Sequence, residues 1–224
     1  MNPSRCLLIA FAPLLAMAAE PAPPAATEQE TAVVAPRPPD PALAGDLRLL
    51  LATAPGLSAI HGVAVDEDGS GGIVLSPEFV LRHRVLGRFG YLIGAGLFVS
   101  AHSITDDTTD GTFTYYAGGA QASAGLTFRI KPGWHAELRA LGQIGRGRLV
   151  FSPEDNDDDD VEGATGRYRA LGVLGGLAYT LTSGLQLAGH AGWQDVEGRS
   201  AFAGVDTTAE GRGMVAGISI GYEF

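Results

Sequence analysis

The chain has 224 residues, of which 46% are hydrophobic, so wholesale disorder is excluded and one sizeable domain is allowed. Its formal net charge is −10 with no basic run, and its single cysteine is Cys6, which together argue against nucleic-acid binding and a disulfide framework. Glycine is abundant, at 32 residues or roughly twice the average usage, so many positions favour a small side chain.

Residues 1–18 have the features of a secretory signal peptide. Arg5 supplies the positive start, an apolar core follows, and Ala16–Ala18 ends the segment in A-x-A form. The apolar run is shorter than the roughly 20 residues that a membrane-spanning helix needs. We therefore predict that the chain is exported and that Cys6 is removed with the signal.

Residues 19–45 are rich in proline and alanine and have no apolar periodicity. This composition is typical of an extended, disordered periplasmic linker. A specific partner-binding role is the alternative interpretation of this segment.

From Asp46 to Phe224 the hydrophobic pattern has a period of two, which is typical of β-strands. The segments are longer than the usual strand of about 5–6 residues and long enough to cross a bilayer when tilted. The first segment alternates poorly and contains Pro55. The eight predicted strands are 46–60, 72–85, 91–104, 112–130, 134–151, 167–181, 185–202 and 212–224.

Short and long connectors alternate along the chain. The short ones carry glycine or proline, as tight turns do, and the long ones are polar. This order is typical of an up-and-down barrel with both termini at the end that has the short turns. The short turns are 86–90, 131–133 and 182–184, and the long loops are 63–71, 105–111, 152–166 and 203–211.

Each predicted strand has a continuous apolar face and a face of glycines and charges. In 134–144, for example, Trp134 and Leu138 share the apolar face, and Glu137 and Arg139 lie on the other. A barrel in lipid has an apolar exterior and a polar, narrow lumen that also favours glycine. The sequence therefore predicts an all-β fold, a closed eight-stranded antiparallel transmembrane β-barrel over residues 46–224.

Aromatic residues occur near both ends of the predicted strands, where the two membrane interfaces would lie. Those near the turn end are Tyr91, Trp134, Tyr179, Tyr222 and Phe224, and those near the loop end are Phe113, Tyr115, Tyr116 and Trp193.

The signal, the order of strands and loops, and the final "ISIGYEF" resemble the small eight-stranded outer-membrane barrels of Gram-negative bacteria, of the OmpA/OmpX type. The resemblance covers residues 46–224. It implies contact with outer-membrane lipids and lipopolysaccharide, both termini in the periplasm, and long loops outside the cell. In that family the barrel-assembly machinery recognises a last strand that ends in Phe after alternating apolar positions. Ile220, Tyr222 and Phe224 match this assembly signal.

The inward-facing charges predict a polar lumen. Four arginines nearly balance three glutamates, and buried charges have to be paired. We interpret them as an ion-pair and hydrogen-bond network that fills the lumen, with a narrow, weakly conducting pore as the alternative. The network comprises Glu78, Arg82, Arg84, Gln121, Arg129, Glu137, Arg139, Gln143, Gln186, His190 and Glu223.

The start of segment 66–79 resembles a calcium loop at Asp66, Asp68 and Ser70. The twelfth position is Pro77 rather than the required glutamate, and the flanking segments have strand patterns rather than helical ones. A polar hairpin loop is therefore the preferred interpretation, and neither a metal nor another cofactor is predicted. The acidic run 154–160 is interpreted as a solvated loop tip that collects divalent cations loosely at most.

Lipid-modifying enzymes also use this fold, and they need a serine and a histidine near the outer leaflet. In "SAHS", Ser100 and His102 share the inward face, whereas Ser103 faces outward. We predict no enzymatic activity and keep a lipid-A-modifying enzyme as the competing hypothesis. The predicted function is a structural or surface-interaction role, in adhesion or envelope integrity, with the acidic loops contacting an extracellular ligand.

Overall fold

The computed structural model describes residues 42–224 except 64, 66, 107–110 and 154–159, so the predicted signal and most of the predicted linker lie outside the described residues. Within the described part, no helix is long and apolar enough to span a membrane. The described chain forms ten strands of one sheet. They are β1 Leu43–Ala54, β2 Ala59–His61, β3 Glu67–Leu86, β4 Phe89–Asp106, β5 Gly111–Lys131, β6 Trp134–Pro153, β7 Val161–Glu162, β8 Gly166–Thr180, β9 Leu185–Phe202 and β10 Val205–Glu223.

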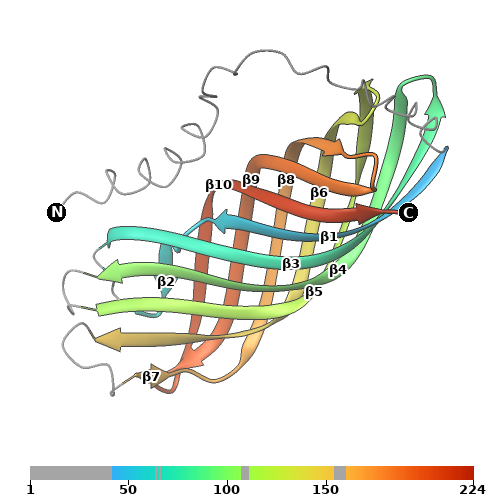
Figure 1. Ribbon diagram of the computed structural model, residues 1–224. Coiled ribbons are helices and arrows are strands. Elements are labelled where there is room, and N and C mark those ends of the chain that lie inside the picture. The colour runs from blue at the N-terminus through green and yellow to red at the C-terminus, as the bar shows by residue number, and fades with distance from the viewer. Residues whose placement is uncertain (1–41, 64, 66, 107–110, 154–159) are drawn as a thin grey trace, which may run out of the picture. The chain divides into compact units, whose positions relative to one another are not determined.

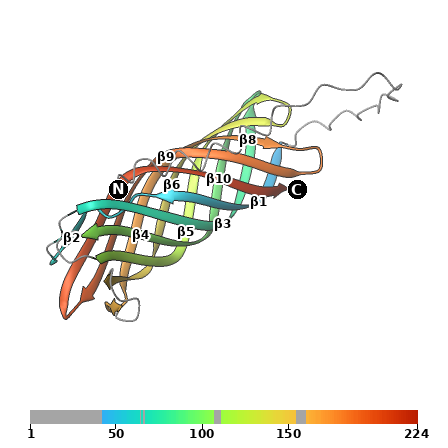
Figure 2. The ribbon, with the colours of Figure 1, turned by 60° about the vertical axis from the view of Figure 1, so that its left-hand side comes forward.

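The sheet closes on itself into a barrel (Figures 1 and 2). β1 lies between β3 and β10, and it pairs with β10 from Asp46 opposite Glu223 to Ala52 opposite Gly217. Because β2 and β7 have only three and two residues, eight long strands form the wall, antiparallel and in chain order. The predicted closed eight-stranded antiparallel barrel is confirmed.

The predicted first strand, 46–60, is wrong in its extent, because it is divided into two strands. β1 ends at Ala54, and the chain returns to the wall only where β2 pairs with β10. Pro55 explains the break, because proline has no N–H to donate to the strand ladder. After Pro55 the chain enters the lumen, where the side chain of Leu57 is buried in an apolar core.

The start of the barrel also differs from the prediction. β1 begins at Leu43, so residues 43–45 belong to the wall and not to the linker. Gly45 exchanges backbone hydrogen bonds with Phe224, donating over 3.2 Å and accepting over 2.9 Å. These two bonds extend the β1–β10 seam to its end.

Tight turns connect the strands at one end of the barrel, the turn end, which carries the C-terminus in Figure 1. Gly87, Gly133 and Gly184 lie in these turns with positive φ angles of 57°, 78° and 89°. Glycine adopts this backbone region without steric penalty. The predicted short connectors between β3 and β4, β5 and β6, and β8 and β9 are confirmed.

At the other end, the loop end, one predicted long loop is wrong. Residues 203–211 do not form a loop: Ala203 and Gly204, with φ angles of 49° and 80°, make a two-residue hairpin turn, and β10 begins at Val205. Two positive φ angles match the twist of the flanking strands. Asp206 and Glu210, which suggested a loop, are exposed outward side chains of a strand that extends beyond the apolar part of the wall, whereas Thr207 is buried on the inner face of that strand. In the same way, β3 begins at Glu67, within the predicted loop 63–71.

The two faces of the wall have the predicted polarity. The exterior is apolar over the turn-end part of the long strands, whereas most charged side chains there point inward and are buried or partly buried. The most exposed side chains of this apolar belt include Leu97, Leu126, Leu138, Ile144, Leu171, Met214 and Ile218.

One glycine pair shows why small residues are needed inside. Gly119 of β5 and Gly145 of β6 are register partners on the inward face. A Cβ on either would lie 2.2 Å from a carbonyl oxygen of the partner strand, closer than any real contact. The two strands approach and bend at this point only because both side chains are absent.

The lumen has two different halves. Toward the turn end it holds buried charged and amide side chains, and toward the loop end it is an apolar core, which was not predicted. This core includes stacked or tilted rings, with Tyr168 contacting Phe98 and Tyr115 at centroid distances of 5.3 and 6.2 Å.

Candidate functional site

A bidentate ion pair lies in the turn-end half of the lumen. Arg48 of β1 donates from Nη1 and Nη2 to the two carboxylate oxygens of Glu137 on β6, both over 2.8 Å. It also donates to Asp46 over 2.8 Å, and all three side chains are almost completely buried. The contact crosses the lumen between strands that are not neighbours, so it ties opposite sides of the wall together.

A second cluster adjoins the first through Asp46. Arg82 of β3 donates from Nε and Nη2 to Asp46 over 2.8 and 2.9 Å, and it also pairs with Glu223 of β10. His135 lies between the clusters, with ring Nε2 2.8 Å from Arg82 Nη1 and 3.1 Å from Glu137 Oε1. Arg48 and Arg82 therefore each contact two carboxylates, as buried charges require.

A third pair lies further toward the middle of the barrel. Arg139 donates to Glu78 over 2.5 Å, and the Ser123 hydroxyl donates to the other oxygen of Glu78 over 2.5 Å. Amide side chains continue the polar layer, because Gln194 donates to Gln143 over 3.0 Å and Gln143 donates to Gln121 over 3.2 Å.

The remaining predicted lumen residues lie at the edges of this network. His190 contacts Ser219 over 2.9 Å, and Gln186 donates to Thr180 over 3.2 Å. Arg84 and Arg129 are partly buried near the turn end, at register positions opposite Gly90 and His135.

The sequence analysis missed the charged or titratable members Asp46, Arg48 and His135, and the polar members Ser123 and Gln194. Asp46 and Arg48 are two residues apart on β1 and face the lumen, whereas Leu47 and Leu49 face the exterior. That alternation was the available signal, but Pro55 and the poor pattern after it obscured the strand. His135 shares the inward face with Glu137 and could have been included on the same ground.

The competing enzyme hypothesis rests on Ser100 and His102, which the structure brings together. His102 donates from Nδ1 to the Pro55 carbonyl over 2.8 Å, which leaves Nε2 to accept from Ser100 Oγ at 3.1 Å or from the Tyr168 hydroxyl at 3.0 Å. A backbone carbonyl stands where a carboxylate would orient a catalytic histidine. His102 is 1% exposed, and the segment from Pro55 to Leu57 packs over it.

The residues that suggested a calcium loop do not form a compact loop. Asp66 lies outside the described residues, and Asp68 and Ser70 belong to the extended strand β3. A calcium loop wraps its ligands around the ion, which an extended backbone cannot do. In the described ranges, no group of three or more His, Cys, Asp or Glu side chains is arranged to hold a metal ion.

Aromatic rings mark both borders of the apolar belt, with one correction. At the turn end, Trp134 packs against Tyr179 at 4.9 Å between centroids, and Phe224 stacks on Phe79 at 6.0 Å. At the loop end, Tyr116 and Trp193 face outward. Phe113 and Tyr115, predicted to lie at the loop-end membrane interface, instead belong to the lumen core, because strand parity turns both inward.

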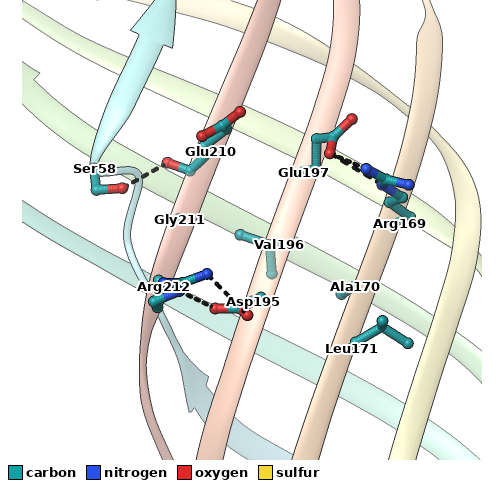
Figure 3. A pocket seen from close by; sticks show the side chains of 10 residues that line it. All are labelled: Ser58, Arg169, Ala170, Leu171, Asp195, Val196, Glu197, Glu210, Gly211 and Arg212. Atoms are coloured by element: carbon teal, nitrogen blue, oxygen red, sulfur yellow. Dashed lines mark hydrogen bonds and ion pairs between the residues drawn. The ribbon is translucent and has the colours of Figure 1, made fainter.

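Charged side chains replace apolar ones on the exterior just beyond the belt (Figure 3). On β8 and β9, Arg169 donates from Nε to Glu197 over 3.0 Å, and Arg199 donates to the other oxygen of Glu197 over 2.8 Å. On β10, Arg212 donates to Asp195 over 2.5 Å. The hydrogen bonds from Arg169, and then the hydrogen bond from Arg199, lower the pKa of Glu197 below its ordinary value.

No protein-family model matches this chain, and none of the curated proteins matches it. Among solved structures, the chain resembles Neisserial surface protein A at 16% identity, covering 80% of this chain and 95% of that one, with a TM-score of 0.32. It resembles Ail, the attachment invasion locus protein of Yersinia pestis solved with the heparin analogue sucrose octasulfate, at 17% identity, covering 81% and 99%, with a TM-score of 0.33. It resembles the P. putida toluene transporter TodX at 9% identity, covering 81% and 89%, with a TM-score of 0.23. At these TM-scores the likenesses do not assign a function.

Proposed function

We propose that this protein is an integral outer-membrane barrel of Gram-negative bacteria with a structural or surface-interaction role. The observation that carries the proposal is the inverted polarity of the wall, with Leu138 outside and Glu137 and Arg48 buried inside. Water would favour the opposite arrangement, whereas lipid requires this one. The apolar rows match the roughly 9–11 residues of a transmembrane strand, as in 134–144, 171–179 and 185–193.

The lumen network supports a structural role rather than transport. The ion pairs of Arg48, Arg82 and Arg139 link four of the eight long strands, β1, β3, β6 and β10, across the lumen, and the side chains that make them are largely buried. A wide aqueous pore would instead leave such charges solvated along its wall. The pore alternative therefore has less support than a filled barrel.

The competing enzyme function also has less support. The Ser100–His102 hydrogen bond is the one feature in its favour. Both side chains are buried, and the imidazole is oriented by the Pro55 carbonyl and shared with the Tyr168 hydroxyl. A lipid acyl chain in the outer leaflet would have no access to them, so the pair is better explained as part of the lumen core.

The surface role is assigned to the loop end, which would face the outside of the cell. Two of its connections, from β1 to β3 and from β6 to β8, are longer than the turns, and the second contains the acidic run 154–160. Loops held by a rigid barrel are the usual place for binding residues. We assign the contact with an extracellular ligand to these loops and place the termini in the periplasm.

Site-directed labelling tests this orientation. Cysteine placed at the exposed Ala164, at the loop end, should react with a membrane-impermeant maleimide on intact cells. The matched control is Ser183→Cys in the exposed turn between β8 and β9, which should react only after the outer membrane is disrupted. Cys6 does not interfere if the signal is removed. Labelling of Ser183→Cys but not Ala164→Cys in intact cells would reverse the orientation, and labelling of both only after disruption would contradict a loop end that faces the outside of the cell.

The last strand is proposed to be read by the barrel-assembly machinery. Ile220, Tyr222 and Phe224 form an outward row, and Phe224 stacks on Phe79. For Phe224→Ala we expect outer-membrane abundance to fall severalfold, while unfolding of the refolded barrel in detergent changes little, because one exposed ring is a small part of the total burial. Immunoblots of outer-membrane fractions and urea titrations measure the two quantities. Unchanged abundance in cells would show that this ring is not part of the signal.

A further inference from the structure

The border between the apolar belt and the charged band is sharp on β6, β8 and β10. The last outward apolar residues there are Ile144, Leu171 and Met214, each strongly exposed. The next outward position on each strand is an arginine. In a bilayer, these guanidinium groups would lie at the depth of the lipid headgroups. The three arginines are Arg146, Arg169 and Arg212.

Further arginines lie next to this border, directly opposite one another. The strand register places Arg146 of β6 beside Arg167 of β8, and Arg167 beside Arg199 of β9. Like charges in directly opposed positions destabilise a sheet. An anion bound across the three guanidinium groups would remove this repulsion.

The acidic partners in the described part of this surface do not balance its arginines. Arg148 pairs with Glu162, and Arg169 and Arg199 share Glu197. Among the described residues, no carboxylate pairs with Arg146 or Arg167. Five arginines therefore face two glutamates, on a protein whose formal net charge is −10.

A groove of about 630 Å³ lies at this place. Its apolar lining includes Ala120 and Ile144, which continue the belt, and its polar lining includes Arg146, Arg167 and Arg199. An adjoining groove of about 560 Å³ over β8–β10, drawn in Figure 3, shares Arg169 and Glu197. Hydrocarbon on one side and guanidinium groups on the other is the lining that an amphiphile with an anionic head would need.

We propose that the outer surface of β6, β8 and β9 is a binding site for a glycolipid that carries more than one phosphate in its headgroup. The inference rests on the proposed outer-membrane location. Arg146 and Arg199 are separated by two strand spacings, about 10 Å, which is wider than one phosphate. Arginine binds phosphate oxygens in a bidentate manner. With the phosphates on these arginines, the acyl chains of the lipid would lie along the apolar side of the groove.

The other occupant to be distinguished is the chain's own acidic run 154–160, because it lies in the connection between β6 and β8. Sequence proximity alone would allow its carboxylates to meet these arginines. If the lipid occupies the site, neutralising the acidic run should leave lipid binding in place. If the acidic run occupies the site, lipid binding should begin only after the run is neutralised.

The test uses full-length mature protein refolded in detergent and titrated with purified bisphosphorylated lipid A, with the bound lipid measured by native mass spectrometry. The variant Arg146→Gln, Arg167→Gln, Arg199→Gln should bind on the order of 100-fold more weakly, at about fivefold for each arginine near an anionic headgroup. The control Arg88→Gln, Lys131→Gln removes two exposed positive charges at the turn end and should change binding by less than about twofold.

Each other outcome overturns the proposal. If the triple variant binds lipid A as tightly as the unchanged protein, these arginines do not form the site. If the triple variant loses affinity for phosphatidylglycerol by the same factor as for lipid A, the arginines attract any anionic lipid and the site is not specific. Lipid binding that begins only when Asp157, Asp158 and Asp159 are changed to asparagine would make the acidic run the occupant. Heat-modifiable gel migration in lipid vesicles checks insertion separately, so failure of the membrane assignment is distinguished from failure of this site.

Discussion

Replacing Glu137 with alanine is expected to lower the free energy of unfolding of the barrel by about 3–5 kcal/mol. The carboxylate accepts both hydrogen bonds of the bidentate pair with Arg48, whose side chain is 1% exposed. Without Glu137, the guanidinium keeps only Asp46, which Arg82 also uses. A buried charge would therefore lose most of its compensation.

Urea titration of the barrel in lipid vesicles, followed by tryptophan fluorescence, measures this loss. Removing both charges with Arg48→Leu, Glu137→Leu should restore most of the stability, because no unpaired charge remains and Asp46 keeps Arg82. Glu162→Ala is the matched exposed control; it breaks the pair with Arg148 and should cost at most about 1 kcal/mol. A Glu137→Ala barrel as stable as the Glu162→Ala barrel would contradict the structural role of the lumen network.

Leu138→Arg is expected to have the second large effect, a loss of about 2–4 kcal/mol when the barrel is in a bilayer. Leu138 lies on the exterior of β6, 56% exposed, between Leu126 of β5 and Gly175 of β8. Its position midway along the apolar row 134–144 would place the new charge near the middle of the hydrocarbon. On a water-soluble barrel, the same exposed substitution would change the stability by no more than about 0.5 kcal/mol.

The matched control is Val205→Arg. Val205 is also an exposed apolar residue, at 51%, but it lies at the start of β10, beyond the apolar belt. Its replacement should change the stability in vesicles by less than about 0.5 kcal/mol. Equal effects of the two substitutions would mean that the apolar belt is not embedded in lipid, and the membrane assignment would have to be abandoned.

The sequence by itself determined the number of long strands, their alternation with short turns, and the face on which most side chains lie. These properties are local: a period of two fixes the facing of each residue, and Gly87, Gly133 and Gly184 mark turns through their backbone freedom. The same local reasoning failed where polarity was taken to mean a loop. Residues 203–211 are polar because their strand extends beyond the apolar belt, which cannot be seen without knowing where the belt ends.

Only the tertiary structure decided which inward and outward groups meet. Arg48 and Glu137 are 89 positions apart and lie on strands that are not neighbours, so their contact depends on barrel closure and strand tilt rather than on parity. The row of Arg146, Arg167 and Arg199 depends in the same way on the register of three strands. Pro55 signalled a break in the sequence, but closure of the barrel decided that the chain after it would fill the lumen. Alternation specifies a face, whereas partners are set by register and shear, which are properties of the closed sheet as a whole.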